Sequence, residues 1–233
     1  MNKLLELKKI SFSYNEIILD KIDLTIREND YIGVIGPNGG GKTTLLKIMV
    51  DLILPHKGTI WKTRGLKIGY LPQYKWIDFD FPIRVMDVVL AGLMDKKKLF
   101  FSKDEKKQAL ELLDKMGILS QAKKNIGELS GGQAQRVFLC RSLISNPNLL
   151  LLDEPDTFVD KTFKNQFYEL IKELNEKMAV VLVSHDLGVV SSYVKTIACV
   201  NRNLYYHESS KIDEKLLKSY SCPVEIITHG HLP

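Results

Sequence analysis

Residues 36–44 read Gly36-Pro37-Asn38-Gly39-Gly40-Gly41-Lys42-Thr43-Thr44, which matches the pattern G-x-x-x-x-G-K-[ST]. The five residues before this stretch, 31–35, are apolar and favour a β-strand. After it, apolar residues recur at helical spacing, at Leu45, Leu46, Ile48 and Met49. The stretch therefore predicts a phosphate-binding loop that joins a buried strand to a helix.

A glycine-rich loop in this position binds phosphate through its backbone. Successive N–H groups point into one concavity at the positive end of the following helix, and no side chain blocks the approach. Lys42 adds a full positive charge for the β- and γ-phosphates, and the Thr43 hydroxyl is placed to ligate Mg²⁺. The flanking strand and helix argue against a turn that binds nothing. The motif by itself does not separate kinases, GTPases and ATPases.

Composition sets broad limits. The 233 residues are enough for one domain with an insertion or for two small domains, and 45% hydrophobic with 26% charged residues is typical of a globular protein. The net charge of +5 is mild: it fits a protein near anionic lipid or nucleic acid, but a slightly lysine-rich solvated surface is the simpler explanation. Cys140, Cys199 and Cys222 lack the spacing of a zinc site or a disulfide framework, which favours a reducing compartment.

No targeting or membrane segment is predicted. The first ten residues have scattered lysines but no apolar core followed by a cleavage site, so they do not resemble a signal peptide. Nowhere do about 18 apolar residues follow one another. We therefore expect any association with a membrane to depend on a partner.

Three regions follow one another along the chain. Residues 1–84 are β-rich apart from the helix after the phosphate loop, and the alternation over residues 3–13 predicts an edge strand. Residues 85–145 have helical periodicity, with Ala109, Leu110, Leu113 and Met116 expected on one helix that ends at Gly117, and read as an inserted helical subdomain. Residues 146–233 return to alternating strands and helices.

The third region predicts a parallel sheet. The run 149–152 is apolar on both faces, as a central parallel strand should be, and Asp153 and Glu154 stand at its end. A helical segment follows, and then a second apolar run, 179–183, delivers Ser184-His185-Asp186. Strand, helix and buried strand in this order imply right-handed crossovers, with both faces of the sheet covered.

With these motifs in order, the chain resembles the ATP-binding cassette (ABC) ATPases over nearly its whole length. Leu129-Ser130-Gly131-Gly132-Gln133 is identical to the signature LSGGQ of that family, which is a very specific match. The run ending in Asp153 and Glu154 resembles the Walker B strand with its acidic pair. Tyr14, Gln73 and His185 occupy the places of the adenine-stacking aromatic residue, the Q-loop glutamine and the switch histidine.

The resemblance implies a fold and a set of roles. The fold is α/β: a RecA-like P-loop core with a mainly parallel sheet, an N-terminal antiparallel β subdomain and an inserted α-helical signature subdomain. Asp153 is expected to hold Mg²⁺ together with Thr43 and Gln73, and Glu154 to polarise the attacking water. His185 is expected to hydrogen-bond the γ-phosphate of ATP.

The signature implies a second copy of the chain. Ser130, Gly131 and Gly132 offer a hydroxyl and bare N–H groups at a helix N-terminus, which suits an anion. In the family this segment faces the γ-phosphate bound by the other subunit, so ATP joins two head-to-tail cassettes. Residues 156–160 depart from the family's usual small-residue D-loop, although Asp160 keeps the aspartate at its end.

Two segments are more particular. Residues 69–73 with 77–92 resemble the Q-loop region of ATPase subunits from zinc and manganese importers, and residues 222–230 resemble their C-terminal tail. This resemblance implies an ATP-hydrolysing subunit on the cytoplasmic face of the cell membrane. Its expected partners are permease subunits and, indirectly, a metal-binding substrate-binding protein, with no nucleic acid. His229 and His231 are read as part of a flexible tail and not as a metal sensor.

Other functions stay open at this point. A soluble ABC ATPase for cofactor assembly is the main alternative. Members that act on ribosomes usually carry two cassettes, and DNA-repair members carry a long coiled coil, whereas this chain has one signature and no heptad run. A nucleotide-binding regulator without turnover is disfavoured by Glu154.

Overall fold

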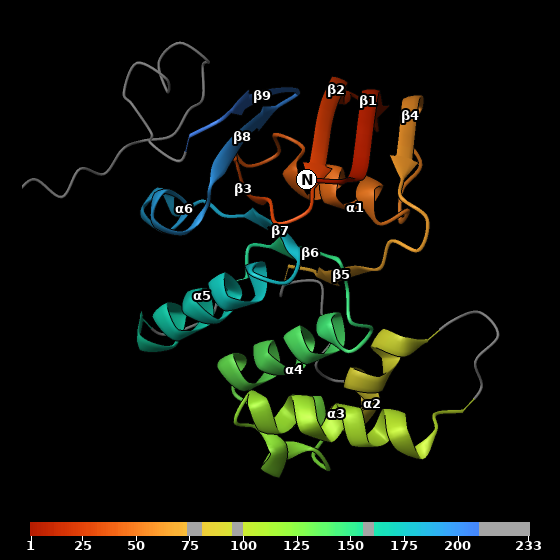
Figure 1. The fold of residues 1–233 in the computed structure, drawn as a ribbon, viewed down its shortest axis with the longest axis vertical. Helices are drawn as coiled ribbons and strands as arrows, with labels where there is room; N and C mark the ends of the chain where they lie inside the picture. Colours follow the sequence, from red (N-terminus) through yellow and green to blue (C-terminus); the bar gives the residue numbers. More distant parts are fainter. Residues whose placement is uncertain (74–80, 95–99, 156–160, 210–233) are drawn as a thin grey trace, which may run out of the picture.

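The computed structural model describes residues 1–73, 81–94, 100–155 and 161–209, with only the backbone at 161–163 and 189. Two sheets occupy one end of the molecule, and a layer of helices occupies the other (Figure 1). None of the helices formed by these residues combines the length and the apolar character needed to span a bilayer.

The larger sheet has six strands in the order β5-β6-β7-β3-β8-β9. In chain order these are β3 (Tyr31–Ile35), β5 (Ile68–Leu71), β6 (Leu149–Asp153), β7 (Ala179–Val183), β8 (Thr196–Asn201) and β9 (Asn203–His207). Neighbouring strands are parallel except for β8 and β9. Every residue of β3, β6 and β7 is buried, which explains their continuous apolar sequences.

The smaller sheet has three antiparallel strands in the order β2-β1-β4. They are β1 (Lys3–Ser13), β2 (Ile17–Arg27) and β4 (Lys57–Lys62). The prediction of an edge strand over residues 3–13 was therefore wrong, because β1 is paired on both sides. Its second partner, β4, follows the phosphate loop and its helix, so local alternation could not reveal the pairing. The alternation of apolar and polar residues in β1 indicates only that one face of the strand is in contact with solvent.

Each face of the larger sheet carries its own hydrophobic core. In β7, Val181 and Val183 pack against the smaller sheet and α1 (Lys42–Met49). Val180 and Leu182 pack on the other face, with the remaining helices. These are α2 (Val85–Leu90), α3 (Lys103–Lys115), α4 (Gly131–Leu143), α5 (Lys161–Asn175) and α6 (Leu187–Tyr193). The phosphate-loop helix α1 and the signature helix α4 thus lie on opposite faces of the sheet (Figure 1).

The helical layer is formed by α2, α3 and α4, with short 3₁₀ helices η2 (Ala91–Leu93), η3 (Leu119–Gln121) and η4 (Ile126–Glu128). Ser102 begins α3 with a capping box to Glu105. Ala109, Leu113 and Met116 of this predicted helical segment are buried, whereas Leu110 on α3 is 38% exposed. A neighbour at i+1 lies about 100° around the helix and turns away from the core.

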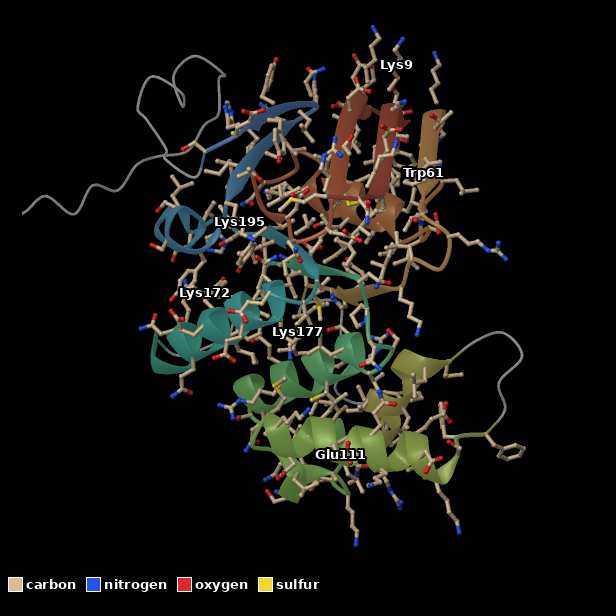
Figure 2. The ribbon with its side chains drawn as sticks, in the orientation of Figure 1. Lys9, Trp61, Glu111, Lys172, Lys177 and Lys195 are labelled. Carbon is tan, nitrogen blue, oxygen red and sulfur yellow. The ribbon has the colours of Figure 1, made fainter. Side chains whose placement is uncertain are left out.

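Polar contacts join the helices to the sheets. Asn175, at the end of α5, is buried, and its amide donates to the carbonyl oxygens of Asp30 and Met178 at 2.8 and 3.0 Å. Lys195 (Figure 2) donates to the carbonyl of Asn29 and to Asn175 Oδ1, both at 2.7 Å. These bonds fix the turn that leads into β3, the strand that carries the phosphate loop.

Candidate functional site

The phosphate loop leaves β3 and enters α1 along a path that needs glycine. Gly36, Gly39 and Gly41 have φ values of 148°, 79° and 99°, in the left-handed region that other residues avoid. A Cβ at Gly36 would also lie 2.0 Å from the carbonyl oxygen of Val200. The glycines therefore allow the backbone of the loop to pass close to β8. Asn38 and Gly39 at the loop tip are exposed, and Thr44 is half-buried on α1.

Lys42 is held against its own loop. Its side chain is almost fully buried, and its Nζ donates to the carbonyl oxygens of Gly36 and Pro37, both at 2.9 Å. These bonds run back over the loop, so the ammonium group is positioned beside the loop before any ligand arrives. A preorganised charge costs less ordering on binding than a mobile lysine would.

Two oxygen ligands for a cation meet at the end of β6. Thr43 Oγ1 donates to Asp153 Oδ1 at 3.1 Å, although the two residues are 110 positions apart. Tyr70 on β5 donates its hydroxyl to Asp153 Oδ2 at 3.4 Å. The sequence analysis missed Tyr70. The sequence offered one signal for Tyr70: it stands two residues before Pro72, near the end of the strand that leads to Gln73.

Burial controls the electrostatics of this pair. Asp153 has no exposed surface, and desolvation raises the pKa of its carboxyl above the ordinary value. The charge of Glu154 raises that pKa further, while the hydrogen bonds from Thr43 and Tyr70 and the charge of Lys42 lower it. Burial likewise raises the pKa of Tyr70 above its ordinary range, with the charge of Asp153 as a second cause.

We expect Asp153→Asn to stabilise the nucleotide-free chain at pH 7. Because the folded-state pKa of Asp153 lies above the unfolded one, the folded state binds more protons between the two values, and stability falls as pH rises through that window. Each pKa unit of difference is worth about 1.4 kcal/mol in the free energy of unfolding. Urea unfolding at pH 7 should show this gain in the free energy of unfolding, and unfolding at about pH 3.9, the ordinary pKa of an aspartate, should show that the gain is lost.

Asp114→Asn provides the matched control, since Asp114 is an exposed aspartate on α3. It should change the free energy of unfolding by less than about 0.5 kcal/mol at either pH. If Asp153→Asn instead destabilised the chain at pH 7, the hydrogen bonds of the carboxylate would outweigh its burial.

Glu154 and Gln73 come together from neighbouring strands. Glu154 has a φ of 48°, and its N–H donates to the carbonyl of Val183 at 3.0 Å. The amide of the buried Gln73, just beyond β5, donates to the Glu154 carboxylate. The register between β5 and β6 therefore brings these two predicted residues into contact.

His185 lies at the end of β7, which is hydrogen-bonded to both β3 and β6. Its side chain is exposed, whereas Ser184 before it is fully buried. Asp186 after it accepts a hydrogen bond from Lys164 Nζ at 2.7 Å, which ties this loop to α5. His185 thus stands on the same edge of the sheet as the phosphate loop and Asp153.

Tyr14 lies in the turn between β1 and β2. Its ring is 63% exposed, and it meets the ring of Phe12 edge to face at 4.9 Å. Leu19 and Ile18 of β2 contact Gly41, so this hairpin packs against the phosphate loop. An exposed aromatic face beside a phosphate site is suited to stacking on a nucleotide base.

The signature is ordered as a helix cap. Ser130 is the N-cap of α4: its Oγ accepts from Gln133 N at 3.3 Å, and its N–H donates to Gln133 Oε1 at 3.1 Å. Gly131 and Gly132 follow, with open space around Gly132, and Leu129 before them is half-buried. Because α4 and α1 cover opposite faces of the sheet, the fold does not bring these residues to the phosphate loop of the same chain.

Several predicted features lie outside the described residues. These are Asp160 with the rest of the segment 156–160, residues 77–80 of the segment that resembles metal importers, and the C-terminal tail with Cys222, His229 and His231. Within the described part, the side chains of Cys140 and Cys199 are buried. The same part holds no group of three or more His, Cys, Asp or Glu side chains that could bind a metal ion.

Comparisons with known proteins agree with this geometry. The ABC transporter family profile matches residues 19–157. The zinc uptake system ATP-binding protein ZurA of Listeria innocua is 37% identical over 228 residues, which cover 90% of this chain and 87% of that protein. The zinc import ATP-binding protein ZnuC of Hydrogenovibrio crunogenus is 35% identical, covering 86% and 80%.

Solved structures show the same fold. The dimeric structure of MJ0796, a bacterial ABC transporter cassette, superposes with a TM-score of 0.77 at 27% identity, covering 90% of this chain and all of that one. The predicted fold class is therefore confirmed, including the mainly parallel core and the antiparallel β sheet. Because the chain matches these proteins in sequence and in structure over most of its length, it belongs to the ABC transporter family.

Proposed function

We propose that this chain is the ATP-hydrolysing subunit of an ABC transporter that imports a divalent transition metal, zinc or manganese. The observation that carries the proposal is the convergence of Lys42, Asp153 and Glu154 at one sheet edge, in a chain similar to zinc-import ATP-binding proteins over most of its length. The names of those relatives indicate which ion is transported, and the residues of the site indicate the reaction.

ATP enters with its phosphates in the loop of residues 36–44. The backbone N–H groups at the start of α1 and the Lys42 ammonium neutralise the β- and γ-phosphates. The adenine stacks on the exposed face of Tyr14.

The residues beside the loop fit Mg²⁺. Thr43 Oγ1 and the Asp153 carboxylate are 3.1 Å apart and offer the hard oxygen ligands that this ion prefers. Asp153 would hold the ion through its hydration shell, and Gln73 would add an oxygen. The bound ion would supply charge neutralisation to the phosphates. The buried Asp153 carboxylate would also gain a cation that compensates its desolvation.

Glu154 acts as the general base. It stands one residue beyond Asp153 and polarises the water that attacks the γ-phosphate, while His185 hydrogen-bonds that phosphate. In the nucleotide-free chain the Gln73 amide is bonded to Glu154. Gln73 must therefore release or share this carboxylate when the metal and water arrive.

Two chains complete the site. The N-terminus of α4 offers the Ser130 hydroxyl and the N–H groups of Gly131 and Gly132, on the opposite face of the sheet from α1. A head-to-tail homodimer would place this signature on the γ-phosphate bound by the other chain, with Asp160 near the interface. MJ0796, a related cassette, has been solved as a dimer.

The remaining partners follow from this role. The division into 1–84, 85–145 and 146–233 would let the helical part move against the core as ATP binds. Permease subunits would receive that motion at the cytoplasmic face of the membrane, and a metal-binding substrate-binding protein would deliver the ion to them. The role requires no contact with nucleic acid.

Coexpression with the neighbouring membrane genes tests this function. We expect affinity-purified chain to carry a permease, and we expect deletion of its gene to lower cellular uptake of radioactive zinc or manganese. A plasmid copy should restore uptake, and a Glu154→Gln copy should not. A chain that never copurifies with a permease, in cells with normal metal uptake, would favour the role in cofactor assembly.

A further inference from the structure

Three aromatic rings form a chain at the end of the smaller sheet. The ring of Phe12 is stacked on the ring of His56, with centroids 4.9 Å apart and an interplanar angle of 24°. On its other side, Phe12 meets Tyr14 edge to face at 4.9 Å and 87°. Phe12 is 7% exposed and Tyr14 is 63% exposed, so a buried ring separates an exposed tyrosine from the histidine.

His56 is fixed in place by backbone groups of β1. Its N–H donates to the carbonyl of Ser11 at 3.0 Å, and its Nδ1 accepts from Ser13 N at 3.4 Å and lies 3.2 Å from Ser13 Oγ. The loop before β4 is thereby tied to the residue that precedes Tyr14.

Phe12 belongs to the core between the two sheets, but it also borders open space on the side of His56. An open cavity of about 1180 Å³ lies beside the hairpin, and both Phe12 and His56 line it, together with Ile17 and Lys57. Without the imidazole, the ring of Phe12 would gain room to turn into this cavity. Tyr14 would then lose the edge contact that sets its ring plane, because little else can hold a side chain so exposed.

We propose that His56 is a positioning residue for the adenine of ATP, acting through Phe12 on Tyr14. The inference rests on the proposed binding of ATP at this site. The contacts of His56 described above are with residues 11–13, so we expect its effect on the base and not on the phosphates. Aromatic contacts of this kind contribute about 0.5–1.5 kcal/mol, which corresponds to about 2- to 10-fold in affinity.

The test compares ATP with inorganic tripolyphosphate, which keeps the charge and lacks the base. Isothermal titration calorimetry on the full chain should show ATP binding weakened about 2- to 10-fold by His56→Ala, with tripolyphosphate binding unchanged. His56→Phe keeps a ring against Phe12 and should restore ATP affinity to within about twofold. His56→Asn keeps a hydrogen-bond acceptor for Ser13 without the ring and should behave like the alanine variant. In a Tyr14→Ala background, His56→Ala should have no further effect.

Equal weakening of ATP and tripolyphosphate by His56→Ala would overturn the inference, because a general disturbance of the fold or the loop would then be the cause. An undiminished effect of His56→Ala in the Tyr14→Ala background would overturn it as well. A wild-type chain that bound tripolyphosphate no more weakly than ATP would refute the stacking of the base on Tyr14 and this inference with it, but it would leave ATP hydrolysis at the phosphate loop untouched. A wild-type chain that bound neither would refute the proposed function itself.

Discussion

Glu154→Gln should lower kcat for ATP hydrolysis by about 10²- to 10⁴-fold while leaving ATP affinity within about twofold. Glutamine has the size of glutamate and still offers an oxygen to the Gln73 amide, which is bonded to this side chain in the wild type. The substitution therefore removes the base and keeps the contact. Steady-state phosphate release and calorimetric ATP binding give the two numbers.

The same variant should accumulate as an ATP-bound dimer. If ATP joins two chains and hydrolysis separates them, a chain that cannot hydrolyse ATP should elute in size-exclusion chromatography at twice the monomer mass of 26.6 kDa. Glu176→Gln is the matched control, since Glu176 is exposed just beyond α5, and it should keep wild-type turnover and elution. A Glu154→Gln chain with normal turnover would remove Glu154 from the role of base.

Lys42→Ala should weaken ATP binding by about 30-fold or more, because removing one partner of a buried charge pair costs about 2–5 kcal/mol. The loss has two sources. The phosphates lose their only fixed ammonium group among the loop residues, and the carbonyls of Gly36 and Pro37 lose the donor that holds them at 2.9 Å. The loop would then be less ordered when ATP arrives.

Thermal unfolding checks this result without a turnover assay. A ligand at 100 times its dissociation constant stabilises the folded state by about 2.7 kcal/mol, so ATP should raise the unfolding temperature of the wild type and hardly that of Lys42→Ala. Lys47→Ala is the matched control, because Lys47 lies in the last turn of α1, away from the loop. The unfolding temperature of this variant should respond to ATP like that of the wild type. An unchanged affinity of Lys42→Ala for ATP would refute the role of this lysine in the phosphate loop.

Some contacts of the site could not be read from the chain. The hydrogen bond from Tyr70 to Asp153 joins residues 83 positions apart, and it depends on β5 lying beside β6 in a particular register. No local pattern carries that register, because a shift by one residue would turn every side chain to the other face. The stacking of His56 on Phe12 likewise requires β4 to return beside β1.

Local chemistry was sufficient for the parts of this protein that act within a few residues. Short-range geometry and hydrophobicity specify the phosphate loop at 36–44, the capped signature at Ser130 and the buried strands β6 and β7. The motifs, the family and the fold class could therefore be predicted from the order of the residues. Other features depend on strands that are distant in sequence. These are the two partners of β1, the hydrogen bond between Gln73 and Glu154, and the position of α4 on the opposite face of the sheet from α1. Packing of whole elements sets those contacts, because burial of the two sheet faces fixes which strands become neighbours.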